Sequence, residues 1–265
     1  MSPEYLPEVS EAEARGRVAN VYEEIRRTVG SSVVNLVYRH LAVEPARLEA
    51  VWSELRPNLA SSAAGSAAGR LVDQASPAGI AAIAPRALAA VGVDVERMRL
   101  VHATLDVYAH ANSLNVLGMQ ALLHGSPGLP GNGDDGVEPQ PLPALPILPM
   151  ADLMTLPPAT LALLDEMSAT LVGEDEPRLV PSLLRHFAGN APLLALLWTS
   201  LRPVAETSLG ARRLAVATDA RDLAGRLPHR VSKIEDPALR VTAERFVVAM
   251  SGMLVAGEGI RAAVG

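Results

Sequence analysis

Asn112 is a polar residue on a helix face that is otherwise apolar. The spacing of apolar residues predicts a helix over Val95–Leu123, in which Leu105, Tyr108 and Met119 lie four or seven residues from Asn112 and therefore share its face. Burying an amide without hydrogen-bond partners costs free energy. Asn112 therefore either joins two helices or positions a water molecule or a ligand, and the second role makes it a candidate catalytic residue.

An Arg-His pair occurs twice, as Arg39-His40 and as Arg185-His186. A guanidinium could clamp a substrate carboxylate through two parallel hydrogen bonds, and a histidine could serve as acid or base near neutral pH. The alternative is structural, with each arginine fastening a helix end or a neighbouring carboxylate. The candidate catalytic residues are Asn112, Tyr38, His40 and His186.

Both Arg-His pairs belong to a longer internal repeat. VVNLVYRHLAVEPARLEAVWSELRP, from Val33 to Pro57, aligns without a gap to LVPSLLRHFAGNAPLLALLWTSLRP, from Leu179 to Pro203, with nine identical pairs. Trp52 aligns with Trp198. The two tryptophans would either anchor the core or form the walls of an apolar pocket between the copies.

A segment rich in proline and glycine separates the two copies. Between Gly125 and Pro149 these residues are so frequent that neither helix nor sheet can persist. We therefore expect a first helical repeat over residues 1–124, a linker over 125–150 and a second helical repeat over 151–265, packed as one compact unit about a pseudo-twofold axis. The duplication does not require Asn112, since Met250 stands at the equivalent place in the second half.

The composition favours an all-α fold. Of 265 residues, 49% are hydrophobic but only 3% are aromatic, so Ala, Leu and Val must form the core, as in packed helices. Ser10 and Glu13 have the spacing of a capping box, which predicts that the first helix begins at Ser10. No segment shows the alternation typical of a strand.

Several classes of function are excluded or disfavoured. The net charge of -6 and the absence of a basic cluster argue against nucleic-acid binding. The chain has no cysteine, which removes thiol catalysis and thiolate metal sites. The acidic N-terminal segment lacks the apolar core of a signal peptide, so we expect a cytoplasmic protein with no membrane partner. We expect no metal and no cofactor, and leave open whether the protein is a homodimer.

Three segments carry a resemblance to a known family. VYEEIRRTVGSSVVNLVYRHLAVEPARLEAVWSELRPNL, the second copy of the repeat and YAHANSLNVL resemble the group I 2-haloacid dehalogenases. The resemblance implies an all-helical enzyme of two repeats with the active site between them. It also implies halide removal by direct attack of water, with an aspartate of the second repeat as base and an asparagine late in the first repeat holding the water.

The match to this family is complete at one functional position and breaks at the other. Asn112 corresponds in position to the asparagine that the resemblance implies. Where the family has an acidic residue just before the arginine, this sequence has Ser182, Leu183 and Leu184. A leucine cannot accept a proton from water, whereas direct displacement needs a base close to the attacking water.

Three hypotheses follow from this departure. We favour a divergent, cofactor-independent enzyme that keeps the scaffold but performs lyase, isomerase or cyclisation chemistry on an apolar organic substrate. The alternatives are a metal-free hydrolytic 2-haloacid dehalogenase with a displaced carboxylate, and a non-catalytic small-molecule-binding or assembly protein. The candidate substrate-binding residues are Asn35, Arg39, Trp52, Ser182, Leu183, Leu184, Arg185 and Trp198.

Overall fold

The computed structural model describes residues 4–129, 146–174 and 176–265, and in these ranges the protein is all-α, as predicted. Within them the β structure is limited to two isolated bridges, Tyr5 with Arg178 and Ser126 with Val231. The helices are α1 (Gly16–Val29), α2 (Leu36–Leu41), α3 (Pro45–Leu59), α4 (Ser62–Gln74), α5 (Pro85–Ala90), α6 (Val95–His124), α7 (Pro158–Val172), α8 (Ser182–Ala188), α9 (Ala191–Leu201), α10 (Gly210–Ala224) and α11 (Pro237–Val264), with the short turns η1 (Leu153–Thr155), η2 (Arg202–Val204) and η3 (Ala205–Leu209).

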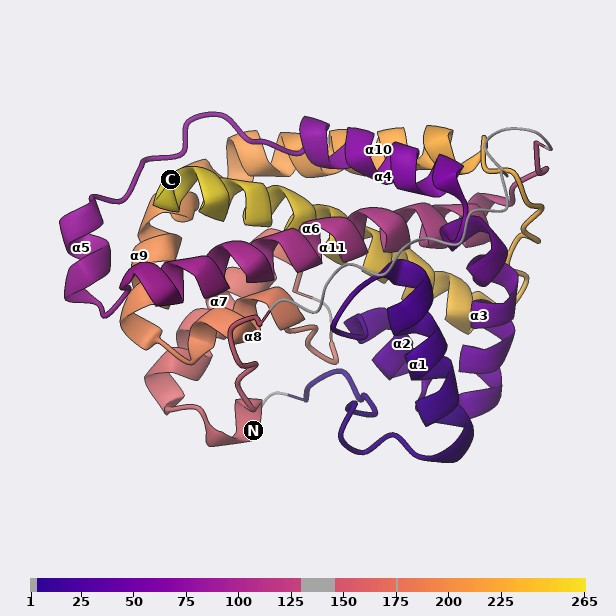
Figure 1. Ribbon diagram of the computed structural model, residues 1–265, viewed down its shortest axis with the longest axis horizontal. Helices are drawn as coiled ribbons and strands as arrows, with labels where there is room; N and C mark the ends of the chain where they lie inside the picture. The colour runs from indigo at the N-terminus through magenta and orange to yellow at the C-terminus, as the bar shows by residue number, and fades with distance from the viewer. Residues whose placement is uncertain (1–3, 130–145, 175) are drawn as a thin grey trace.

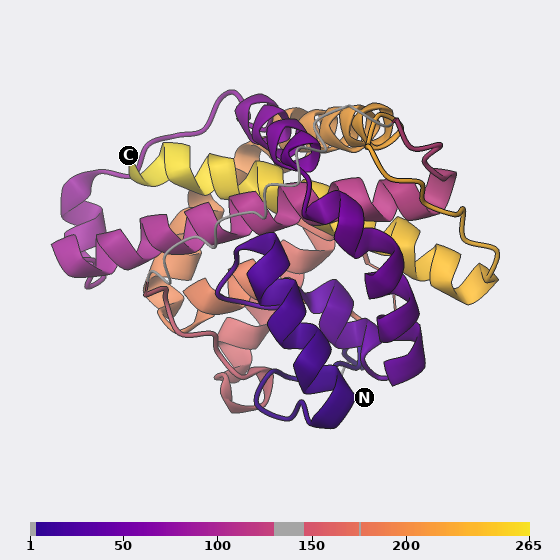
Figure 2. The same ribbon diagram turned by 45° about the vertical axis from the view of Figure 1, so that its right-hand side comes forward.

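Two long antiparallel helices, α6 and α11, form the middle layer of the molecule (Figure 1). Helices α4 and α10 cover one side of this pair (Figure 1, Figure 2). On the other side α1–α3 form one cluster and α7–α9 form a second. A site between the two clusters is therefore floored by α6 and α11.

Helix α6 is buried on nearly all of its faces from Val101 onward. It begins after Asp94, whose side chain accepts a hydrogen bond from the backbone N–H of Arg97 at 2.7 Å, the usual way to satisfy a free donor at a helix start. A helix that is buried all round belongs to a core. The amide on its central part, Asn112, therefore lies inside the protein.

Helix α11 is long and apolar enough to cross a membrane by length and composition alone. However, 72% of its most apolar window is buried inside the protein. This burial is the pattern of a core helix, and α11 packs against α6, α7, α9 and α10.

The expected linker is only partly visible. Residues 130–145 of the segment 125–150 lie outside the described residues. Its described ends pack onto the body, because Ser126 pairs with Val231 and the backbone N–H of Leu148 donates to the hydroxyl of Thr104 at 3.0 Å. The division into two repeats about a pseudo-twofold axis stays a prediction.

The first helix begins later than the capping box predicted. Ser10 and Glu13 do exchange hydrogen bonds, with the Ser10 hydroxyl donating to the Glu13 carboxylate at 2.7 Å. The box closes a turn instead of starting α1, because Arg15 is extended and Gly16 adopts a positive φ of 54°. The backbone turns there, and the helix starts at Gly16.

Gly252 sets how closely α11 approaches the end of α7. A Cβ atom at this position would lie 2.6 Å from the backbone oxygen of Leu171. We expect Gly252→Ala to lower the free energy of unfolding by about 1–3 kcal/mol, because overpacking moves a backbone. Gly69→Ala on α4 is the matched control: nothing lies within 4 Å of its Cβ, and we expect a gain of about 0.5–1 kcal/mol from helix propensity. Urea unfolding measures both, and equal stabilities would contradict the close approach.

Candidate functional site

A small, partly open cavity lies between the two helix clusters. Its walls come from the start of α2, the middle of α6, the start of α8 and the middle of α11, so both halves of the chain contribute. The lining residues are Asn35, Leu36, Val37, Tyr108, Asn112, Leu179, Pro181, Ser182, Leu183, Phe246, Ala249, Met250 and Met253. Four of the residues proposed from sequence, Asn35, Asn112, Ser182 and Leu183, meet there.

Two asparagines from different helices form a pair on the cavity wall. Asn35 donates from Nδ2 to Oδ1 of Asn112 at 3.0 Å, and both residues are only 4% exposed. Asn35 precedes α2 as its N-cap residue, but its side chain makes no capping bond. This side chain is therefore free to serve the cavity instead of the helix end.

Tyr108 lies one turn before Asn112 and brings a histidine to the cavity. Its hydroxyl contacts Nε2 of His186 at 3.0 Å, and Nδ1 of His186 contacts the backbone oxygen of Leu148 at 2.5 Å. A carbonyl can only accept, so Nδ1 carries the proton and Nε2 accepts from Tyr108.

This pair is neutral over a wide pH range. Burial lowers the pKa of His186 to about 4, and burial raises the pKa of Tyr108 to about 12. Between these values the proton stays on Tyr108. The sequence analysis did not propose Tyr108 as a site residue, although its place on the same helix face as Asn112 was the signal.

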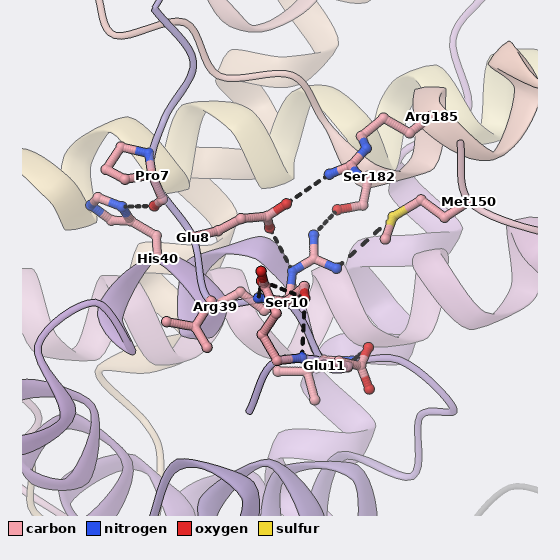
Figure 3. Close-up of polar contacts among 12 residues, drawn as sticks. Pro7, Glu8, Ser10, Glu11, Arg39, His40, Met150, Ser182 and Arg185 are labelled. Atoms are coloured by element: carbon pink, nitrogen blue, oxygen red, sulfur yellow. Dashed lines mark hydrogen bonds and ion pairs between the residues drawn. The ribbon is translucent and has the colours of Figure 1, made fainter. Parts of the chain in front are cut away.

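A carboxylate from the N-terminal segment joins the two repeated arginines (Figure 3). Glu8 Oε1 accepts from Arg185 Nη1 at 2.8 Å, while Glu8 Oε2 lies 2.8 Å from Arg39 Nε. The second contact is an ion pair without hydrogen-bond geometry, since neither of those two atoms has a hydrogen-bond partner. Arg39 is 1% exposed, so it requires such a counter-ion.

Arg39 reaches the cavity only through Ser182. Its Nη2 donates to the Ser182 hydroxyl at 2.7 Å, and its Nη1 contacts the Met150 sulfur at 3.9 Å (Figure 3). Ser182 in turn hydrogen-bonds Tyr108, which lowers the Tyr108 pKa against the larger effect of burial. The carboxylate clamp expected of Arg39 is thus formed with Glu8, and neither Arg39 nor Arg185 lines the cavity.

The two tryptophans lie in separate helix clusters, where each makes a contact within its own cluster. Trp52 donates to Glu24 of α1 at 3.1 Å, and Trp198 donates to Glu166 of α7 at 2.9 Å. Each indole therefore fastens two helices of its own cluster, and neither lines the cavity. The tryptophans took the structural role that the sequence left open.

Three further candidates also lie away from the cavity wall. The Tyr38 hydroxyl donates to Asn115 at 2.6 Å, and burial raises the pKa of Tyr38. His40 contacts the backbone oxygen of Pro7 at 2.8 Å through Nδ1. Leu184 is fully buried but does not line the cavity. Local spacing placed these residues near the site without showing which way each side chain points.

Most of the lining residues are apolar, and most of these were not among the candidates from sequence. Phe246, Met250 and Met253 of α11 line the cavity together with Leu183 and Leu179. Their three- and four-residue spacing on α11 was the available signal. Among the residues that the structure describes, the wall includes no Asp, Glu, Lys or Arg, and no group of three His, Asp or Glu could hold a metal ion.

The fold is similar to solved structures of D-2-haloacid dehalogenase. A mutant of that enzyme gives a TM-score of 0.84 at 15% identity, covering 98% of this chain and 96% of that chain. Its complex with lactate gives 0.83 at 16% identity, covering 98% and 96%. A mutant complex with 2-chloropropionate gives 0.82 at 16% identity, covering 99% and 97%. The resemblance stated from sequence is confirmed at the level of the fold.

The chain matches neither a protein-family model nor a curated protein sequence. The likeness to the solved structures, at 15–16% identity, is one of fold.

Glu8 should be a large single contributor to stability. We expect Glu8→Ala to lower the free energy of unfolding by about 3 kcal/mol, because it leaves the buried Arg39 without a counter-ion. The matched control is Glu49→Ala, which breaks the solvent-exposed pair with Arg17 at 3.3 Å and should cost less than about 1 kcal/mol. Denaturant unfolding compares the two variants, and a similar cost for both would show that the Glu8 contacts are dispensable.

His186 should make stability fall in mild acid. Its pKa of about 4 lies below the ordinary histidine value, so between pH 6.5 and 4 the unfolded chain binds the extra proton. Stability due to neutral His186 is complete above pH 6.5 and declines as the pH falls towards 4. We expect the wild type to lose about 3 kcal/mol more than His186→Gln between pH 7 and pH 4. His124, whose pKa is also lowered, is present in both proteins and cancels; parallel pH profiles would contradict the assignment.

Proposed function

We propose that this protein is a cofactor-independent small-molecule enzyme, and that the cavity between α2, α6, α8 and α11 binds its substrate. The observation that carries the proposal is the composition of the cavity wall. Asn35, Asn112 and Tyr108 are polar groups among mainly apolar lining residues, and Tyr108 is hydrogen-bonded to His186 behind the wall. A few convergent polar groups in an otherwise apolar cavity are typical of ligand sites.

The ligands of the dehalogenases with the same fold support a small ligand in this cavity. Those proteins were solved with lactate and 2-chloropropionate, which have three carbons each. The cavity here is also small. We propose that the ligand here is likewise small and that it places a polar end on the asparagine pair.

The proposed chemistry differs from hydrolysis driven by a carboxylate. Leu183 lies on the cavity wall where the family resemblance implies an acid, and a leucine provides no base. Tyr108 is then the lining residue that we propose exchanges a proton with the substrate, and its hydroxyl is hydrogen-bonded to the unprotonated Nε2 of His186. This pair fits a lyase, isomerase or cyclisation reaction, in which the bound substrate shifts the pKa of Tyr108.

A displaced carboxylate base finds little support. Glu8 is engaged by Arg39 and Arg185. Glu11 accepts from the backbone N–H of Val34 at 2.9 Å and pairs with Arg26 at 2.6 Å. Neither glutamate lines the cavity.

Non-catalytic binding is a second candidate function. The observation in its favour is that the pKa values of Tyr108 and His186 both lie far from neutrality. General acid-base catalysis works best when the pKa lies near the operating pH. Turnover of a bound compound that is lost in Tyr108→Phe would separate an enzyme from a binding protein.

We also infer that the two helix clusters descend from one repeated unit. The Glu24–Trp52 and Glu166–Trp198 bonds each join the first and third helix of a cluster. Arg39 and Arg185 stand on the corresponding short helices α2 and α8. The constant sequence offset and these matching contacts support duplication.

Occupancy of the cavity can be observed directly at its two methionines. The chain has eight methionines, and Met250 and Met253 line the cavity. With methyl-labelled methionine, we expect three-carbon acids, alcohols and amides to shift the NMR signals of these two residues and to leave those of exposed Met154 unchanged. Titration with each compound gives its affinity. If no compound of this size shifts either signal, the proposed site is wrong.

Halide release tests the reaction class. We expect no release from either enantiomer of 2-chloropropionate above the buffer rate, because no Asp or Glu of the described residues lines the cavity to activate water. The variant Leu183→Asp should release halide at a measurable rate, because it adds a base to the cavity wall. The variant Leu183→Asn should not, because asparagine has the shape of aspartate but is not a base. Circular dichroism checks that both variants fold, since Leu183 is buried. Release by the wild type, retained in Leu183→Asn, would instead favour the displaced-carboxylate alternative.

A further inference from the structure

The asparagine pair leaves two hydrogen-bonding groups without partners. Asn35 uses Nδ2 to donate to Asn112, so its own Oδ1 is free to accept, and this atom is buried without a hydrogen-bond partner. Asn112 uses its oxygen in the same bond, so its NH₂ group is free to donate. Reversing both amides would leave the same two kinds of group, one C=O and one NH₂. Because an unpaired buried acceptor costs free energy, this pair favours a ligand that supplies both a donor and an acceptor.

The other polar groups of the wall are already committed. Arg39 can only donate, and the backbone oxygen of Leu148 can only accept. Arg39 therefore donates to the Ser182 hydroxyl, and the Tyr108 hydroxyl donates to Nε2 of His186, whose Nδ1 donates to Leu148. The asparagine pair is therefore the polar part of the wall that still has free hydrogen-bonding groups for a ligand.

The wall also carries no cation to receive a carboxylate. The arginine nearest to it, Arg39, lies behind Ser182 and shares the carboxylate of Glu8 with Arg185, so its guanidinium does not reach the cavity. A carboxylate on the asparagine pair would present only acceptors, and would leave Asn35 Oδ1 facing another oxygen. Burying an ion without a partner is far costlier than burying a neutral polar group.

We propose, building on the proposed function, that the cavity selects a neutral ligand, a small aliphatic primary carboxamide, over the corresponding carboxylate. The carboxamide N–H would donate to Asn35 Oδ1, and its C=O would accept from the NH₂ of Asn112. The short aliphatic part would lie against Leu183, Met250 and Met253. Every polar group on the wall would then have a partner, and no charge would be buried.

Matched acid and amide pairs test the preference. Propionamide is compared with propionate, and lactamide with lactate, by titration of the Met250 and Met253 methyl signals at pH 7. The members of each pair have nearly the same shape, so the comparison isolates charge and the N–H donor. We expect each amide to bind at least tenfold more tightly than its acid. Equal or tighter binding of the acids would overturn the amide preference while leaving the proposed site intact, whereas no binding by any of the four would overturn both.

The double variant Asn35→Leu/Asn112→Leu tests whether the asparagines carry the preference. Leucine has the same number of side-chain heavy atoms as asparagine and removes both free groups, so we expect the ratio of the two affinities to fall to within twofold. The control is Asn115→Leu: Asn115 is buried on the same helix but does not line the cavity, and the tenfold preference should persist. A preference that survives the double variant would show that other groups recognise the ligand. Thermal unfolding confirms that each variant is folded.

Discussion

The carboxylate of Glu8 lies between the guanidinium groups of Arg39 and Arg185 and joins the two halves of the chain at the cavity. Arg39 is almost fully buried, and a buried guanidinium without a counter-ion would be strongly destabilising. The N-terminal segment that carries Glu8 is held by backbone bonds from Leu6 to Arg178 and from Val9 to Arg39. The short helices α2 and α8 are thereby fixed relative to each other, and the cavity lies between their first residues.

This ion pair also sets the electrical character of the cavity. Glu8 is shared by Arg39 and Arg185, so Arg39 acts on the cavity only as a hydrogen-bond donor to Ser182. Burial keeps His186 neutral and holds the proton on Tyr108. The result is a cavity wall with polar groups but no ionised side chain.

The similarity to D-2-haloacid dehalogenase covers nearly the whole chain at 15% identity. A fold is preserved by the pattern of apolar burial, which many sequences satisfy. Function depends on a few side chains at a site. Leu183 is buried on α8 and lines the cavity, and a leucine side chain cannot act as a base.

Helical periodicity and composition were enough to predict an all-α protein, a long helix over α6 and a buried amide at Asn112, because these properties depend on residues three or four apart. They also brought Asn35, Ser182 and Leu183 into the candidate set through the repeat and the resemblance. They could not show that Tyr108 meets His186, that Glu8 takes both arginines, or that each tryptophan bonds a glutamate of its own cluster. Those contacts join residues far apart in the sequence, and which side chains meet is decided only when helix faces pack against one another.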